Sequence, residues 1–314
     1  MKVAFIFPGQ GSQAVGMAKD LVENFPKYEH YLTTAEKAMN IPISKIMFEG
    51  PLEELTKTYH AQPALLLSST IAASLLMEHG LQPDYVAGHS LGEYSALVMA
   101  GVLSVQDGAT IVHKRGKYMN EAVPAGEGAM AAILGMQAAD LEKVTDEITA
   151  QGHAVQVANL NCPGQIVISG TSEGVANASI LAKEQGAKRA IPLTVSGPFH
   201  SSLMRPAASK LAVELAMVSV RAPKVPVIAN VTAQPVEQEQ EIRNLLIEQV
   251  TAPVRWEESV RTMIDLGVDT FVECGPGNVL SGLIKKIDKS VTTYSVFDTI
   301  SLNRALYHLK GDSQ

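Results

Sequence analysis

The chain of 314 residues is 46% hydrophobic and 18% charged, a composition that is typical of compact globular proteins and excludes an extended disordered chain. Its formal net charge of −7 argues against nucleic acid or an anionic membrane as the main partner, because both bind best to an excess of Lys and Arg. Cys162 and Cys274 are too few for a disulfide framework or a zinc site, and no apolar run approaches the roughly 20 residues that cross a bilayer. These features predict a soluble, cytoplasmic protein.

Strands and helices are predicted to alternate through most of the chain. Apolar runs bounded by Gly or Pro predict strands over residues 2–7 and 84–90. Stretches with helical spacing lie between and after them, at residues 11–39, 61–80, 91–103 and 105–123. Beyond residue 195, strands are expected at 226–230 and 269–277, with helices at 242–250 and 256–267. Such alternation is typical of an α/β fold with a mainly parallel sheet.

The middle of the chain has a different pattern. It predicts strands at residues 129–134, 154–161, 164–170 and 187–193, with helices at 138–152 and 172–186. The order β-α-β-β-α-β is that of a ferredoxin-like unit. We therefore predict an α/β domain formed by residues 1–123 and 195–314, with a ferredoxin-like subdomain inserted at residues 124–194.

The segment from Gly88 to Gly92 reads Gly-His-Ser-Leu-Gly and matches the G-x-S-x-G nucleophile elbow. Glycines on both sides of Ser90 let neighbouring backbone approach without a Cβ clash, and the N-terminus of the following helix favours developing negative charge. A serine that merely caps this helix is the simpler alternative. The predicted strand before Ser90 and the helix after it favour the nucleophile.

A serine nucleophile needs a base near neutral pH. His89 adjoins Ser90, but neighbours on a sharp turn point apart, so His89 is expected only in a supporting role. His200 lies in a Gly-Pro loop after the inserted unit and is the favoured base, with capping of the next helix as the alternative. Most acidic residues between Ser90 and His200 fall on predicted helix surfaces, and none stands at an obvious strand end. A Ser-His dyad held by a backbone carbonyl therefore stays open beside a triad.

Two further features are candidates for the same site. The glycine-rich turn at residues 7–17 lacks the lysine of a phosphate-binding loop, and an oxyanion hole and an ordinary strand-to-helix turn explain it equally well. Arg115 lies on the helix after the elbow helix. If it is buried near Ser90, its planar fork predicts an acyl group with a free carboxylate, although a helical arginine is more often at the surface.

Five segments in the right order and at the right intervals resemble the malonyl-CoA:acyl carrier protein transacylases, which load type II fatty acid synthesis. They are FPGQGSQ at residues 7–13, GHSLGEYSAL at 88–97, RGKYM at 115–119, GPFHSSLM at 197–204 and ECGPGNVLSGLIKK at 273–286. The resemblance extends to about Ile287. It implies a hydrolase-like α/β core with mainly parallel sheet plus the ferredoxin-like subdomain.

The resemblance also implies roles for individual residues. Ser90 would be the nucleophile and His200 the base, oriented by the main-chain carbonyl of Gln249. The backbone N–H groups of Gln10 and Leu91 would form the oxyanion hole.

The remaining implied roles concern the acyl group. Arg115 would bind the malonyl carboxylate. Phe199, beside the base, would crowd a substituent on the malonyl α-carbon, and Pro198 stands where the family often has a smaller residue.

The implied reaction is a ping-pong transfer through a malonyl-serine, and it requires no metal or redox cofactor. Its partners would be malonyl-CoA and an acidic, phosphopantetheinylated acyl carrier protein, with the enzyme expected as a monomer. Docking of the carrier would need a local basic patch, for which the candidates are Lys188, Arg189, Lys285 and Lys286. A serine thioesterase or esterase, a polyketide-pathway malonyltransferase and a non-catalytic acyl-group sensor are the alternative functions.

Overall fold

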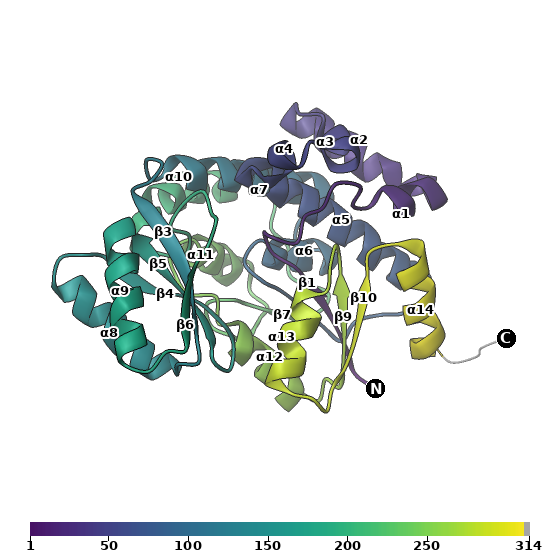
Figure 1. Ribbon diagram of the computed structural model, residues 1–314. Helices are drawn as coiled ribbons and strands as arrows, with labels where there is room; N and C mark the ends of the chain where they lie inside the picture. The colour runs from purple at the N-terminus through teal and green to yellow at the C-terminus, as the bar shows by residue number, and fades with distance from the viewer. Residues whose placement is uncertain (311–314) are drawn as a thin grey trace.

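Residues 1–310 of this computed structural model are built around two β-sheets that occupy separate lobes (Figure 1). The larger sheet has six strands in the order β10-β9-β1-β2-β7-β8, and its pairs are parallel except for β7 with β8. The smaller sheet has four antiparallel strands in the order β4-β5-β3-β6. The predicted α/β class with a mainly parallel sheet is confirmed.

The larger lobe contains both ends of the described chain. Its strands are β1 Val3–Phe7, β2 Tyr85–Gly88, β7 Val227–Ile228, β8 Pro235–Val236, β9 Thr270–Cys274 and β10 Thr292–Val296. Its helices are α1 Lys19–Asn24, α2 Glu29–Met39, α3 Ile43–Glu49, α4 Leu52–Thr56, α5 Thr58–Glu78, α6 Gly92–Met99, α7 Val105–Glu121, α10 Arg205–Met217, α11 Glu239–Gln249, α12 Trp256–Asp265, α13 Val279–Ile287 and α14 Thr299–Lys310, with 3₁₀ turns η1 Pro26–Tyr28 and η2 Ser202–Met204.

Strand β1 is central and buried on both faces of the sheet. Its side chains alternate, because successive residues of a strand point to opposite faces. Phe5 and Phe7 pack into the apolar cluster that includes α5 and α7, whereas Ala4 and Ile6 pack into the cluster with α12 and α13. Helices therefore cover both faces of the larger sheet, as a parallel sheet requires.

The smaller lobe has the β-α-β-β-α-β order predicted from the sequence. Its elements are β3 Gly128–Leu134, α8 Ala138–Ala150, β4 Val155–Cys162, β5 Gln165–Thr171, α9 Ser172–Glu184 and β6 Arg189–Pro192. They enclose an apolar cluster of their own. A short parallel bridge joins the lobes, since Val254 donates to the Ala158 carbonyl and accepts from the Leu160 N–H, both over 2.9 Å.

The structure also departs from the predicted elements. The helix expected over residues 11–39 begins at Lys19 and is interrupted by η1, where proline removes a backbone donor. Helices α3, α4 and α10 were not predicted, nor were β10 and α14 beyond Ile287, which complete one edge of the larger lobe. Among residues 1–310, no helix combines the length and apolarity needed to cross a bilayer.

Candidate active site

Ser90 lies on a sharp turn between β2 and α6. Its φ of 52° is in the left-handed region, which a side chain other than glycine rarely adopts. A Cβ on Gly88 would lie 1.9 Å from the Gly92 carbonyl group, and one on Gly92 would lie 2.1 Å from the Phe7 carbonyl oxygen. The two glycines are therefore required by the close approach of the strand, the helix and β1 around Ser90.

The Ser90 hydroxyl faces His200, with 2.8 Å between Oγ and Nε2. His200 Nδ1 lies 2.8 Å from the Gln249 carbonyl oxygen. A carbonyl can only accept, so Nδ1 carries the proton and Nε2 is free to accept from Ser90. Within residues 1–310, no Asp or Glu contacts His200, and the geometry is that of a dyad with a backbone carbonyl.

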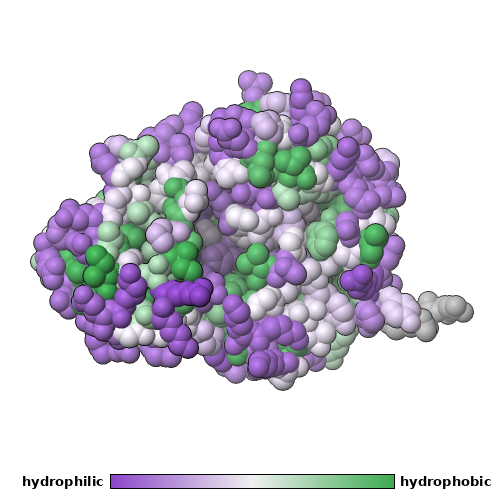
Figure 2. Space-filling model, viewed as in Figure 1, coloured by the Kyte–Doolittle hydropathy of each residue, from purple (hydrophilic) through white to green (hydrophobic). Residues whose placement is uncertain are grey.

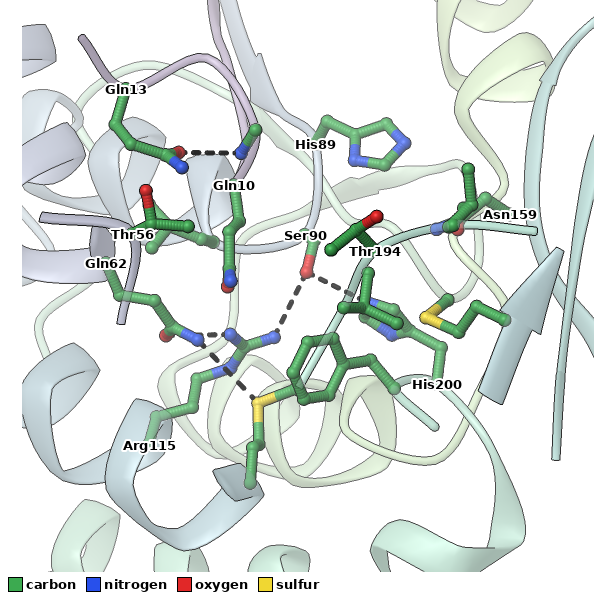
Figure 3. A pocket seen from close by; sticks show the side chains of 17 residues that line it. Gln10, Gln13, Thr56, Gln62, His89, Ser90, Arg115, Asn159, Thr194 and His200 are labelled. Carbon is green, nitrogen blue, oxygen red and sulfur yellow. Dashed lines mark hydrogen bonds between the residues drawn. The ribbon is translucent and has the colours of Figure 1, made fainter. Parts of the chain in front are cut away.

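The His200 imidazole is neutral at physiological pH. Burial, together with the positive charge of Arg115, lowers its pKa from 6.5 to about 3. His89 is turned away from the Ser90 hydroxyl (Figure 3). Its Nε2 lies 2.8 Å from Asn161 Oδ1. His89 thus supports the contact between the two lobes and not the Ser90 hydroxyl.

Arg115 projects from α7 toward Ser90 from the side opposite His200 (Figure 3). Arg115 is only 1% exposed. Its Nη1 donates to Gln62 Oε1 over 2.9 Å. Its Nη2 donates to Gln249 Oε1 over 2.9 Å and to Ser90 Oγ over 3.2 Å. The guanidinium is therefore buried beside the hydroxyl and held by neutral acceptors.

The two backbone N–H groups that were expected to form an oxyanion hole beside Ser90 are free to donate. Among residues 1–310, neither the Gln10 N–H nor the Leu91 N–H has a hydrogen-bond acceptor. Both residues line the pocket that contains Ser90. A Cβ on Gly9 would lie 2.7 Å from the His89 carbonyl oxygen, so glycine there lets the 7–17 loop approach the elbow.

These groups share a pocket of about 200 Å³ between the lobes, where the surface in Figure 2 is hollowed. The larger lobe contributes Ser90, Arg115 and His200, and Phe199 lies beside the base. The smaller lobe and its return segment complete the wall with Met130, Asn159, Leu193, Thr194 and Val195. Every residue predicted for the site lines this pocket except Gln249, which is fully buried behind it.

Glu93 is one of the acidic residues between Ser90 and His200, most of which were expected on helix surfaces, but it is not at the surface. Its side chain is 3% exposed and lies beneath the elbow. Glu93 Oε2 accepts from Gln249 Nε2 over 2.7 Å and from the Asn230 N–H over 3.1 Å. A signal was available, because apart from Glu93 and Ser95 the residues of α6 are glycine or have apolar or aromatic side chains, and they surround the helix, as in helices that are buried on all sides.

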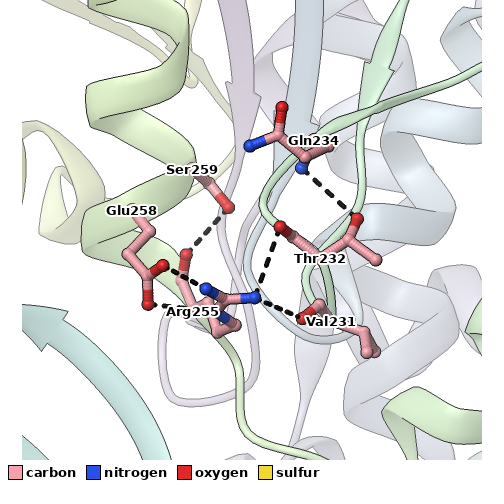
Figure 4. A network of polar contacts seen from close by, with 6 residues as sticks. All are labelled: Val231, Thr232, Gln234, Arg255, Glu258 and Ser259. Atoms are coloured by element: carbon pink, nitrogen blue, oxygen red, sulfur yellow. Dashed lines mark hydrogen bonds and ion pairs between the residues drawn. The ribbon is translucent and has the colours of Figure 1, made fainter.

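Asn230 was also missed as a site residue. Its Oδ1 accepts from the Ser90 N–H over 2.7 Å, and its Nδ2 donates to the Gly88 carbonyl over 2.6 Å. Arg255 fixes the loop that follows Asn230, because its guanidinium donates to the Val231 and Thr232 carbonyls (Figure 4). Its backbone N–H donates to the Asn230 carbonyl. The elbow is thus supported by a segment far away in the sequence.

The sequence profile of the acyl transferase domain family matches residues 4–305. The chain belongs to this family. It is 55% identical over 312 residues to the malonyl CoA-acyl carrier protein transacylase of Bacillus subtilis (strain 168), covering 99% of this chain and 98% of that one. It is 45% identical over 304 residues to the transacylase of the same name from Escherichia coli (strain K12), covering 96% and 98%.

Solved acyl transferase structures have the same architecture. The malonyl CoA-acyl carrier protein transacylase from Coxiella burnetii superposes with a TM-score of 0.95 at 42% identity, covering 98% of each chain. A malonyl-transacylase in complex with its type II PKS acyl-carrier protein gives a TM-score of 0.95 at 43% identity, covering 98% of this acyl transferase and 100% of that chain.

Proposed function

We propose that this acyl transferase moves a malonyl group from malonyl-CoA to the phosphopantetheine thiol of an acyl carrier protein, supplying fatty acid biosynthesis. The observation that carries the proposal is the contact of one hydroxyl, that of Ser90, with both His200 and the buried cation of Arg115. The residues that we propose as nucleophile, base and carboxylate-binding group thereby line one pocket. The activity named for the full-length relatives supports the same function.

In the first half-reaction, Ser90 Oγ attacks the thioester carbonyl while His200 Nε2 takes the hydroxyl proton. The oxyanion of the tetrahedral intermediate accepts from the backbone N–H groups of Gln10 and Leu91, which have no acceptor among the described residues 1–310. The C–S bond then breaks, and the CoA thiolate takes the proton from His200 and leaves as the thiol. The product is a malonyl-Ser90 ester.

In the second half-reaction, the carrier's thiol attacks the ester carbonyl and gives its proton to His200. The C–O bond to Ser90 breaks, and His200 returns the proton to Oγ. A carbonyl partner on Nδ1 gives a weaker base than a carboxylate partner would. We infer that this suits a transferase, because thiols lose their protons far more easily than water does.

Arg115 and Phe199 define the acyl group in this proposal. The malonyl carboxylate would bind the guanidinium, whose planar fork matches it, and would thereby lie on one side of Ser90. Phe199, next to the base, would limit bulk on the α-carbon. An uncharged acyl group would leave the buried cation without a counter-charge, which is costly.

We further propose that the larger lobe, residues 1–123 and 195–314, is a hydrolase-like catalytic domain and that residues 124–194 are a ferredoxin-like subdomain. The antiparallel sheet order and the strand-to-helix position of Ser90 support these classes. A reducing, cytoplasmic location is supported by two buried cysteines that are both free.

The acidic carrier is proposed to dock on Lys188, Arg189, Lys285 and Lys286, and the enzyme to act as a monomer. All four side chains are exposed. Lys286 contacts Gln165 of β5. In the smaller sheet, Leu134 of β3 pairs with Gln165 on one side and with Arg189 of β6 on the other. The basic residues therefore lie near one end of the smaller sheet. Charge reversal at these sites should raise the KM for the carrier and leave the KM for malonyl-CoA unchanged.

Trapping the covalent intermediate tests the proposed function. Brief incubation with malonyl-CoA alone should give a stoichiometric burst of CoA and a malonylated peptide containing Ser90 by mass spectrometry, with neither in Ser90→Ala. Added holo carrier protein should then discharge the ester. Rapid steady hydrolysis without carrier would instead identify a thioesterase.

A further inference from the structure

The buried carboxylate of Glu93 has no part in the steps described above. It lies in the first turn of α6, three residues after the nucleophile, and Oε2 accepts hydrogen bonds from the Gln249 amide and the Asn230 backbone N–H. Burial raises its pKa to about 7, against the opposing effect of these two donors and of the positive charge of Arg115. A buried carboxyl is costly to keep, so its contacts point to a role.

Glu93 contributes to the orientation of the Gln249 side chain. Gln249 Nε2 faces three acceptors, of which Glu93 Oε2 is the nearest at 2.7 Å, followed by the Ser90 carbonyl at 3.0 Å and Asn230 Oδ1 at 3.3 Å. With the amide nitrogen held there, Oε1 faces the guanidinium and accepts from Arg115 Nη2 over 2.9 Å. The chain of contacts therefore runs from Glu93 through one amide to Arg115.

Arg115 has no direct ion pair among residues 1–310. Its hydrogen-bond acceptors are an amide oxygen of Gln62, an amide oxygen of Gln249 and the Ser90 hydroxyl, all neutral. Glu93 is the carboxylate whose charge acts on the guanidinium, and it does so from the far side of the Gln249 amide. A counter-charge one amide away stabilises the cation without occupying the guanidinium in place of a substrate carboxylate.

We propose that Glu93 is a positioning residue for substrate selection. It holds the Gln249 amide so that Arg115 is aligned and remains without an ion pair until the carboxylate of the acyl group binds. The inference rests on the proposed function, because it takes Arg115 as the group that binds the malonyl carboxylate. It assigns the Gln249 side chain a role separate from that of its main-chain carbonyl, which contacts His200.

The test compares Glu93→Met with Glu93→Gln. Methionine has a similar volume but no strong acceptor, whereas glutamine keeps one amide oxygen where Oε2 accepts. The measured quantity is the malonyl preference, the ratio of kcat/KM for malonyl-CoA to that for acetyl-CoA with holo carrier protein. Glu93→Met should lower it about tenfold, the effect of losing one buried hydrogen bond to the Gln249 amide, and Glu93→Gln, which keeps an acceptor there, should restore most of it.

A matched control is available at Glu273, which is also buried and accepts from two backbone N–H groups, those of Leu280 and Ser281, away from the pocket. Glu273→Met should reduce stability and leave the malonyl preference unchanged. If Glu93→Met lowers transfer of both acyl groups equally, or keeps the wild-type preference, Glu93 does not position Arg115 and the inference is overturned.

Two more variants keep the outcome decisive. Should Glu93→Met not fold, Gln249→Met removes the same link while keeping the carbonyl that contacts His200, and an unchanged preference in that variant overturns the inference. Arg115→Ala reports on the proposed function. If it keeps the malonyl preference, the carboxylate-binding role fails and the inference fails with it, whereas loss in Arg115→Ala but not in Glu93→Met overturns the inference alone.

Discussion

Arg115 Nη2 lies 3.2 Å from Ser90 Oγ, the same oxygen that lies 2.8 Å from His200 Nε2. The hydroxyl thus accepts from a buried cation while its proton is directed at the base. A nearby positive charge favours the developing alkoxide but also lowers the pKa of His200. In the proposed mechanism, binding of a substrate carboxylate to the guanidinium would relieve this second effect, so substrate selection and nucleophile activation would both depend on Arg115.

Arg115→Ala should lower kcat/KM for malonyl-CoA about a hundredfold, because a carboxylate would then enter a buried site without a partner. Transfer of acetyl from acetyl-CoA should be spared or raised. Arg115→Lys should recover only part of the malonyl activity, since an ammonium lacks the planar fork. Full retention of malonyl preference in Arg115→Ala would exclude this role for the arginine.

The pH dependence of stability should reveal two buried groups with opposite effects. His200 has a lowered pKa, so its contribution to the free energy of unfolding is full above pH 6.5. That contribution is lost as the pH falls from 6.5 toward 3. This loss is about 2 kcal/mol between pH 6.5 and 5. Glu93 has a pKa raised from 4.5 to about 7, so its contribution to the free energy of unfolding is full below pH 4.5. That contribution is lost as the pH rises through 7.

Urea unfolding at pH 5 and pH 7 measures both effects. Between pH 7 and pH 5, the free energy of unfolding of Glu93→Gln should fall more steeply than that of the wild type, because the group that opposes the effect of His200 is gone. The free energy of unfolding of His200→Gln should fall less steeply. Parallel pH profiles in all three proteins would contradict the two assignments.

The sequence itself predicted the nucleophile elbow because its parts are local, whereas the roles of Gln10, Leu91 and Gln249 were implied by the resemblance to a known family. Ser90 between two glycines needs only a strand before it and a helix after it, and the order of elements in residues 124–194 follows from periodicity. The supports of the site are not local. Asn230 reaches the elbow only because β7 pairs with β2, and β10 has a place only because it pairs with β9. No pattern near either segment specifies its partner strand.

Glu93 shows a different limit. Its position in a helix predicted a solvated face, the usual location of a carboxylate. Burial of the whole of α6 decided otherwise, and Asn230 and Gln249, which satisfy the carboxylate, lie on other elements. Charge on a helix is a weak guide to exposure when most of the other residues of the helix are apolar.

Phe199→Ala should widen the acyl pocket beside the base. Phe199 is largely buried, and its ring lines the pocket next to His200. Removing the ring should raise the ratio of kcat/KM for methylmalonyl-CoA to that for malonyl-CoA by about tenfold, the effect of one relieved steric contact of 1–2 kcal/mol. Phe199→Leu should give an intermediate ratio, and a ratio that does not rise in either variant would place the limit on α-carbon bulk elsewhere.

The close approach at the elbow predicts a large difference between two Gly→Ala changes. In Gly88→Ala, the new Cβ would lie 1.9 Å from the backbone of Gly92, so β2 and α6 must move apart. The free energy of unfolding should fall by about 3 kcal/mol or more, with loss of activity as Ser90 shifts. In Gly282→Ala, within α13, the new Cβ meets nothing within 4 Å, and a helical alanine should add about 0.5–1 kcal/mol with full activity. Urea unfolding with a transacylation assay measures both, and equal stability of the two variants would show that the elbow tolerates a Cβ that the present geometry forbids.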